Sequence, residues 1–199
     1  MRVGLYRTRM RAADILRLRW GFPWRLCGAV VAASLAAAGA AAQAPAALPG
    51  AGELRTEPSY LDLSAGVWDL VGNAHRNRTA AAGAEFRFGR KLFHIGPAAG
   101  VLADLYGGGM VYAGLYGDIP LGPIVVTPLA GFGAWWRGGS RDEDLGSGFE
   151  FRVSLEAAYQ LANRARLGLR FGHISNADTS RTNPGENDLM LTYALPLDF

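Results

Sequence analysis

The sequence predicts an all-β protein, an eight-stranded antiparallel transmembrane β-barrel preceded by a cleaved signal peptide. Three observations lead to this prediction. The chain begins with an export segment, continues as segments with apolar side chains at alternate positions, and ends on an aromatic residue, Phe199. Strands of outer-membrane barrels cross the bilayer in about 9–11 residues, with lipid-facing and lumen-facing side chains alternating. The segments have this length and this pattern.

Residues 1–42 have the three parts of a secretory signal. Seven arginines and one acidic residue stand in residues 1–25, and an uncharged, Ala-rich stretch with small residues at its end follows in 26–42. The basic region is long, so translation starts at either Met1 or Met10. We expect a cleaved signal rather than an uncleaved membrane anchor, because alanine drives membrane insertion only weakly.

Removal of this segment changes the charge and the cysteine content of the chain. The whole chain has 20 basic and 17 acidic residues, and without residues 1–42 its formal net charge changes from +3 to −3. The pI of 9.3 is therefore no argument for nucleic-acid binding. The single cysteine, Cys27, is lost with the signal, so the mature chain has no disulfide framework. Its stability must come from the fold or from the membrane.

The remaining chain divides into a lead and a barrel. Residues 43–58 are rich in Ala, Pro and Gly and predict a flexible N-terminal lead. The outer-membrane β-barrel is expected over 59–199. Its eight strands are predicted at 59–71, 80–90, 93–106, 110–119, 123–135, 148–161, 164–175 and 188–199. An uncharged stretch between Asp118 and Arg137 is long enough for a transmembrane helix, but its three prolines exclude one.

The last predicted strand has the clearest pattern. Apolar residues alternate with other residues up to the C-terminus: Leu189, Leu191, Tyr193, Leu195, Leu197 and Phe199. In a soluble sheet such a face would be an edge that invites aggregation. In a barrel it pairs with the first strand and faces lipid. The aromatic terminus also resembles the recognition signal of outer-membrane barrels.

The connections support the same topology. Those after the first, fifth and seventh strands are longer and more polar than most others, and long outside loops with short periplasmic turns are typical of outer-membrane barrels. With both termini periplasmic, the loop after the seventh strand lies outside the cell. Several aromatic residues near strand ends suggest an interfacial girdle, although core packing explains each of them equally well: Trp68, Trp135, Trp136, Tyr106 and Tyr116.

Two polar residues near the end of the seventh strand could carry chemistry. His173 and Ser175 alternate with the arginines of this strand and share a face with its apolar residues, so we expect both to face lipid. A histidine in reach of a serine can make it a nucleophile. A third group must orient the imidazole, and the turn at 183–185 would fold Glu186, Asn187 or Asp188 back beside the strand. On its own, His-x-Ser is more often a pair of polar rim residues.

The wider motif resembles a known family. His173-Ile174-Ser175-Asn176-Ala177, followed by the Asn183-Pro184-Gly185 turn and a terminal strand, is similar to the PagL family of lipid A 3-O-deacylases. The specific likeness covers the end of the chain from the seventh strand onward, and upstream it rests on the strand pattern. The resemblance implies an eight-stranded barrel in the cell outer membrane, with a Ser-His-Glu triad at the lipid-facing rim of the outer leaflet.

The resemblance also implies roles for individual residues. It makes His173 the base and Ser175 the nucleophile, with Asn183 as an oxyanion-hole donor and Asn176 assisting. The triad glutamate should lie four residues after Asn183, where this chain has Asn187. We take Glu186 as the third member, presented by a shift of one residue. The alternatives are that Asn187 orients a neutral histidine, as in papain-like triads, or that the barrel has lost its activity.

The predicted function is therefore that of a serine esterase, a lipid A 3-O-deacylase that removes the ester-linked 3-hydroxyacyl chain at the 3 position. Its partners are lipid A or lipopolysaccharide as substrate and the lipid of the outer membrane, with no nucleic acid. A homodimer is compatible with the sequence. No cofactor is expected, and no metal either, since His75 and His94 lack metal-ligand spacing and 142–144 is expected to be a solvated loop tip.

Two other classes of function remain open at this stage. A non-catalytic small barrel, structural or adhesin-like, would carry His173 and Ser175 only as polar rim residues. An acyltransferase with a site in the lumen would need its catalytic cluster on the even-numbered positions of the seventh strand. Those positions hold Arg166 and Arg170 but no nucleophile.

Overall fold

The structure, a computed structural model, describes residues 54–70 and 78–197, so the expected signal peptide, His75 and Phe199 lie outside the described residues. The described residues form eleven strands. Among them there is no helix long and apolar enough to cross a membrane. The strands are β1 (Leu54–Thr56), β2 (Ser59–Trp68), β3 (Thr79–Arg87), β4 (Arg90–Leu92), β5 (Ile95–Asp104), β6 (Gly109–Gly117), β7 (Ile119–Leu121), β8 (Ile124–Trp136), β9 (Phe149–Gln160), β10 (Arg166–Ser175) and β11 (Glu186–Leu197).

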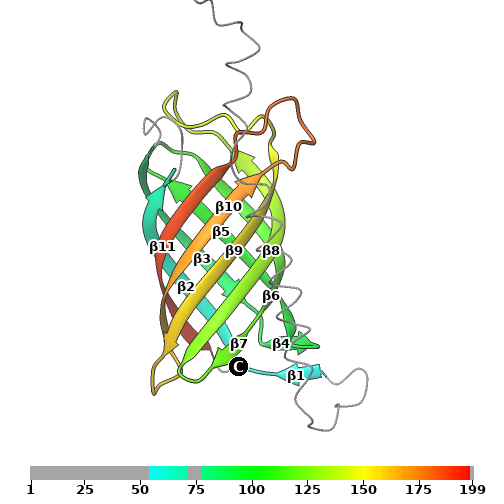
Figure 1. Cartoon of the computed structure of the whole chain (residues 1–199), viewed down its shortest axis with the longest axis vertical. Coiled ribbons are helices and arrows are strands. Elements are labelled where there is room, and N and C mark those ends of the chain that lie inside the picture. Colours follow the sequence, from blue (N-terminus) through cyan, green and yellow to red (C-terminus); the bar gives the residue numbers. More distant parts are fainter. Residues whose placement is uncertain (1–53, 71–77, 198–199) are drawn as a thin grey trace, which may run out of the picture.

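The eight long strands close into an antiparallel barrel (Figure 1). Each pairs with its neighbours in the chain, and β11 returns to pair with β2, for example Leu191 with Ala65. This closure confirms the predicted fold class and the predicted pairing of the last strand with the first. A closed sheet leaves no edge to attract another chain, because every long strand has a partner on both sides.

The two ends of the barrel differ. We call the end that holds the segments 105–108, 137–148 and 176–185 the loop end, which is at the top of Figure 1, and the opposite one the turn end. The short strands β1, β4 and β7 lie at the turn end. β1 pairs with β4, so part of the segment expected to be a flexible lead is ordered as a strand. Such short pairings depend on tertiary contacts, which no local pattern reveals.

The expected alternation of side chains along the strands is confirmed. On β10, Leu167 and Leu169 are exposed by 47% and 56%, whereas Arg166 and Arg170 are buried in the interior. The exposed apolar side chains cover the outer surface of the barrel, as expected for a surface in contact with lipid.

The middle of the interior is crosslinked by charges. Arg87 donates to Glu85 over 2.7 Å and to Glu156 over 2.8 Å, and Arg170 pairs with Asp62 over 3.1 Å. All five side chains are no more than 1% exposed. Burying ions is costly unless they are paired, and these ion pairs offset part of that cost inside the closed barrel.

The interior near the loop end is apolar. Trp68 and Trp135 stack with their rings parallel and 5.5 Å apart, and Leu145 from the 137–148 loop is buried beside them in the same cluster. The girdle interpretation is wrong for these two tryptophans and for Tyr116, which is also buried, while Trp136 is 42% exposed. An indole suits an interface or a core equally well, so the sequence did not distinguish the two places.

Candidate active site

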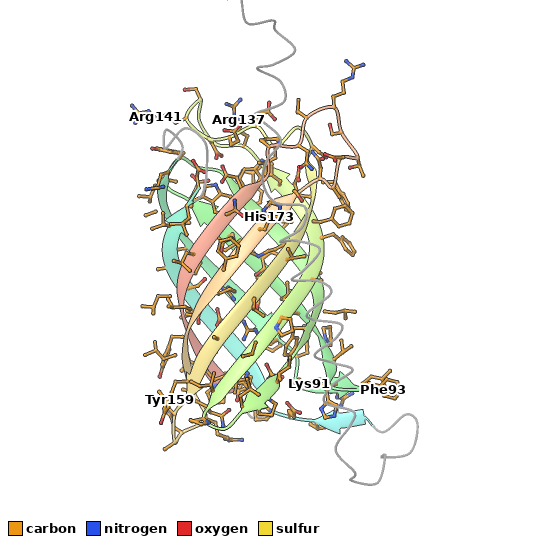
Figure 2. The ribbon with its side chains drawn as sticks, in the orientation of Figure 1. Lys91, Phe93, Arg137, Arg141, Tyr159 and His173 are labelled. Atoms are coloured by element: carbon orange, nitrogen blue, oxygen red, sulfur yellow. The ribbon has the colours of Figure 1, made fainter. Side chains whose placement is uncertain are left out.

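The end of β10 presents two of the predicted site residues on the outward face of the barrel. His173 and Ser175 are both partly exposed, and Figure 2 shows His173 on the wall near the loop end. Their neighbours on β9 are Val153 and Phe151 respectively. Because Phe151 and Phe171 are 38% and 40% exposed, the two polar side chains lie within an apolar surface.

The third group in contact with the histidine is an amide. Asn187 pairs with His173 in the β10–β11 register, and His173 Nδ1 lies 2.9 Å from Asn187 Oδ1. An amide oxygen can only accept, so Nδ1 carries the hydrogen and donates it. In a neutral imidazole this leaves Nε2 as the free basic nitrogen. The contact therefore fixes both the orientation and the tautomer of His173.

Glu186 is placed differently from the prediction. It pairs with Ile174 rather than with His173, and it is 3% exposed on the inward face of β11. Asp188 also points inward, where it forms a bidentate ion pair with Arg152 at 2.7 and 3.2 Å. The expected shift of one residue does not occur, so of the three acidic or amide candidates only Asn187 shares the outward face of His173.

Ser175 is two residues from His173 on the same face, as expected for positions i and i+2 of a strand. Among the described residues its hydroxyl forms no hydrogen bond, either with His173, whose Nδ1 contacts Asn187, or with another group. The other side of the His173 ring is bounded by Gly185, whose φ is +67°. A Cβ at Gly185 would lie 2.8 Å from His173 Cε1, so only glycine lets the turn close against the ring.

The two asparagines predicted for the oxyanion hole have different surroundings. Asn183 is partly exposed; its Oδ1 accepts from the Asn176 backbone N–H at 3.1 Å, and its Nδ2 donates to Asp178 at 2.9 Å. An amide nitrogen has two hydrogens, so one remains for an oxyanion. Asn176 is 0% exposed and points inward. The structure therefore leaves Asn183 partly accessible and in contact with the backbone of Asn176, the residue after Ser175, whereas the Asn176 side chain is buried.

The 137–148 loop was not recognised as part of this region from the sequence. Its Asp142 was expected at a solvated tip but is 2% exposed. Burial raises the pKa of the Asp142 carboxyl, and the neighbouring Asp104 carboxylate also raises it, against the hydrogen bond from the Gly138 N–H. The signal that could have been used is Leu145, the one large apolar residue between Arg137 and Gly148, since such a residue in a polar loop indicates packing.

Within residues 54–70 and 78–197, His, Cys, Asp and Glu form no group of three or more that could hold a metal ion.

Comparisons with known proteins identify the family of the chain. A family model described as lipid A 3-O-deacylase (PagL) matches residues 59–196, which is more than half of the chain. The chain belongs to this family. The lipid A deacylase PagL of Bordetella bronchiseptica is 38% identical over 52 residues, which are 26% of this chain and 29% of that protein.

The fold of the family is also found among solved structures. The crystal structure of the outer membrane enzyme PagL superposes with a TM-score of 0.51 at 22% identity, over 69% of this chain and 99% of that one. This likeness agrees with the closed barrel of this chain.

Proposed function

We propose that this protein is a lipid A 3-O-deacylase, a serine esterase that removes the 3-hydroxyacyl chain from the 3 position of lipid A. The observation that carries the proposal is the His173–Ser175 pair on the outward face of β10, within an apolar surface. A hydrolytic pair on the outside of a barrel wall suits a substrate that lies in the membrane. Membership of the lipid A 3-O-deacylase family supports the same reaction.

The proposed reaction is acyl transfer to water in two steps. His173 Nε2 takes the proton of the Ser175 hydroxyl, and the serine oxygen attacks the ester carbonyl carbon. The carbonyl oxygen becomes an oxyanion, to which Asn183 Nδ2 donates its second hydrogen. His173 then returns the proton to the departing sugar oxygen, leaving an acyl-serine. Water, deprotonated by His173, attacks this ester, and the fatty acid leaves as Ser175 regains its proton.

The third member of this triad is Asn187 in our proposal, in place of the glutamate that the resemblance implies. Its 2.9 Å hydrogen bond to His173 Nδ1 provides the orientation that a carboxylate provides in other triads. A neutral amide provides no charge to stabilise the imidazolium formed during catalysis. Asn187 therefore positions the histidine but contributes less electrostatic stabilisation than a glutamate would.

The location of the site follows from the proposed substrate. We infer that the loop end faces the outside of the cell and that His173 and Ser175 lie at the rim of the outer leaflet of the outer membrane. The ester of lipid A lies between its sugar headgroup and the acyl layer, at the level where the apolar wall meets the loops. The exposed Phe151 and Phe171 beside the pair supply an apolar surface for the acyl chain.

The interior of the barrel offers no competing site on β10. Arg166 pairs with Asp118 over 3.0 Å, and Arg170 pairs with Asp62 over 3.1 Å, with both arginines buried. These positions are occupied by ion pairs, which disfavours the lumenal acyltransferase.

The test is the release of 3-hydroxy fatty acid from lipid A by the purified barrel, followed by mass spectrometry. We expect the wild-type chain to shift lipid A by the mass of one 3-hydroxyacyl group and Ser175→Ala to leave it unchanged. Ser140→Ala, which changes an exposed serine of the 137–148 loop, is the matched control and should remain active. Equal deacylation by Ser175→Ala and wild type would refute the serine mechanism, and no deacylation by either would favour a non-catalytic barrel.

A further inference from the structure

Asn176 follows the proposed nucleophile in the chain, and all of its described polar contacts run to the loops around the site. Its side-chain Nδ2 donates to the backbone carbonyls of Leu145 and Thr182, each over 2.8 Å. Its backbone N–H donates to the Oδ1 of Asn183 over 3.1 Å, and its carbonyl accepts from Thr179. One buried residue thus holds both ends of the loop that carries the proposed oxyanion donor.

The same residue joins two different loops. Leu145 belongs to the 137–148 loop, and Thr182 belongs to the 176–185 loop. Leu145 is 1% exposed and lies in the apolar cluster inside the barrel. The Ser180 hydroxyl adds a second link by donating to the Gly146 carbonyl over 2.6 Å. Gly146 has a φ of +83°, and a Cβ there would lie 2.4 Å from the Thr182 carbonyl oxygen. The loops therefore meet backbone against backbone, with Leu145 fixed in the core.

We propose that Asn176 is a positioning residue for the deacylation reaction, which ties the 176–185 loop to the core-anchored 137–148 loop and so places Asn183 beside Ser175. This inference rests on the proposed function. It replaces the role of direct oxyanion donor that the resemblance implied for Asn176.

Two observations separate a positioning role from a donor role. The Asn176 side chain is 0% exposed, and its two amide hydrogens already have acceptors in Leu145 and Thr182. A group with two hydrogens that are both engaged has none for a substrate. Asn183, in contrast, is partly exposed, and only one contact of its Nδ2 is formed.

The cost of losing this residue follows from its acceptors. Without the amide, the Leu145 and Thr182 carbonyls lose a shared buried donor, and buried polar groups without partners are unfavourable. The 176–185 loop would move to hydrate them, and Asn183 would move with it. A displacement of about 1 Å at a reacting group can reduce the rate about 100-fold.

The first experiment compares Asn176→Asp with Asn163→Ala, both in the folded barrel. Aspartate keeps the shape of asparagine but lacks the two amide hydrogens. We expect kcat for lipid A deacylation to fall about 10- to 100-fold with KM changed less than about threefold, because binding along the apolar wall is untouched. Asn163 caps the turn between β9 and β10 at the opposite end, and its variant should retain the wild-type rate. A wild-type rate in Asn176→Asp would overturn the proposal.

A double-mutant cycle with Asn183→Ala distinguishes positioning from direct donation. If Asn176 acts through Asn183, adding Asn176→Asp to Asn183→Ala should lower kcat by less than about twofold further. If Asn176 itself donated to the oxyanion, the two losses would multiply, and that result would overturn the proposal.

A readout without activity keeps this proposal separate from the proposed function. Amide hydrogen exchange in residues 137–148 and 176–185 should accelerate at least about tenfold in Asn176→Asp, with the β9–β10 turn unchanged. Unchanged exchange in both loops would overturn the tether. If the wild-type barrel failed to deacylate lipid A while these loops loosened as expected, the proposed function would fail and the tether between the loops would stand.

Discussion

The outward and inward faces of β10 and β11 differ although their residues alternate along the same two strands. The outward face carries His173, Ser175 and Asn187, which make one hydrogen bond among themselves and are partly exposed. The inward face carries Ile174 and Asp188, which are buried completely. The alternation therefore separates the residues of the proposed site, which lie outside the wall, from the residues that pack and pair inside it.

The inward side behind the histidine is held by charge. Arg152 and Asp188 pair at 2.7 Å within the barrel, and a Cβ at Gly172, the residue before His173, would lie 2.4 Å from Asp188 Oδ2. Because Gly172 has no side chain, the Arg152–Asp188 pair can lie directly against the backbone of β10. We therefore expect this pair to hold the wall in place and the outward residues to be replaceable without loss of the fold.

The largest expected effect is on the outward face. His173→Ala and Ser175→Ala should each lower kcat by about 10⁴-fold, and the double variant should be little worse than either, because triad members act as a unit. The heat-modifiable folded form should persist in all three, as seen by electrophoresis without boiling. A variant that fails to fold would contradict the separation of tasks between the two faces.

The next effect is on the inward face and concerns stability. Arg152→Ala leaves the Asp188 carboxylate buried without its partner, which costs about 3–5 kcal/mol. Urea unfolding of the barrel in lipid vesicles measures this cost, with the exposed Arg141→Ala as control. An unchanged unfolding midpoint in Arg152→Ala would show that the wall behind His173 does not depend on this pair.

Asn187→Ala should have an intermediate effect on activity. Loss of the bond to Nδ1 lets the imidazole rotate, and we expect kcat to fall about 10- to 100-fold with the fold retained. Asn187→Glu should exceed the wild-type rate, because a carboxylate at the same position stabilises the imidazolium. Steady-state kinetics on lipid A measures both rates. If Asn187→Glu were slower than Asn187→Ala, the result would argue against Asn187 as the third member of the triad.

The smallest effect is expected at Glu186. Its side chain lies inside the barrel, so Glu186→Gln should change kcat by less than about twofold. Comparing Glu186→Gln with Asn187→Ala tests the β10–β11 register, in which Asn187 rather than Glu186 lies opposite His173. A severe loss in Glu186→Gln together with a mild loss in Asn187→Ala would restore Glu186 as the group that orients His173.

The barrel could be predicted because the alternation of apolar side chains is a local property of each strand. The site depends on the register between β10 and β11, which is not a local property. The last strand was expected to start at 188 and starts at Glu186, since Glu186 and Asn187 add two more pairs with β10. In a strand, a difference of one residue moves a side chain to the opposite face. His173 and Ser175 could therefore be placed by counting along β10, whereas their partner could not.

The tether at Asn176 was beyond sequence reasoning for a related reason. Its acceptors are backbone carbonyls of Leu145 and Thr182, and a carbonyl is present at every residue, so no side-chain pattern identifies it. Only the packing of Leu145 into the core brings one of them to Asn176. A motif shows which side chains are present, but not which backbone groups they will meet.

The charged centre of the barrel also has a consequence for the membrane that holds it. Arg87, Arg152 and Arg170, which stand at successive levels of the interior, are each no more than 1% exposed. A side chain that lines an open channel is accessible to solvent, whereas these three are not. The barrel therefore offers no path for ions or small solutes, and a planar bilayer that contains many copies should keep its baseline conductance. We therefore expect a membrane that holds this protein at high density to stay impermeable to small solutes.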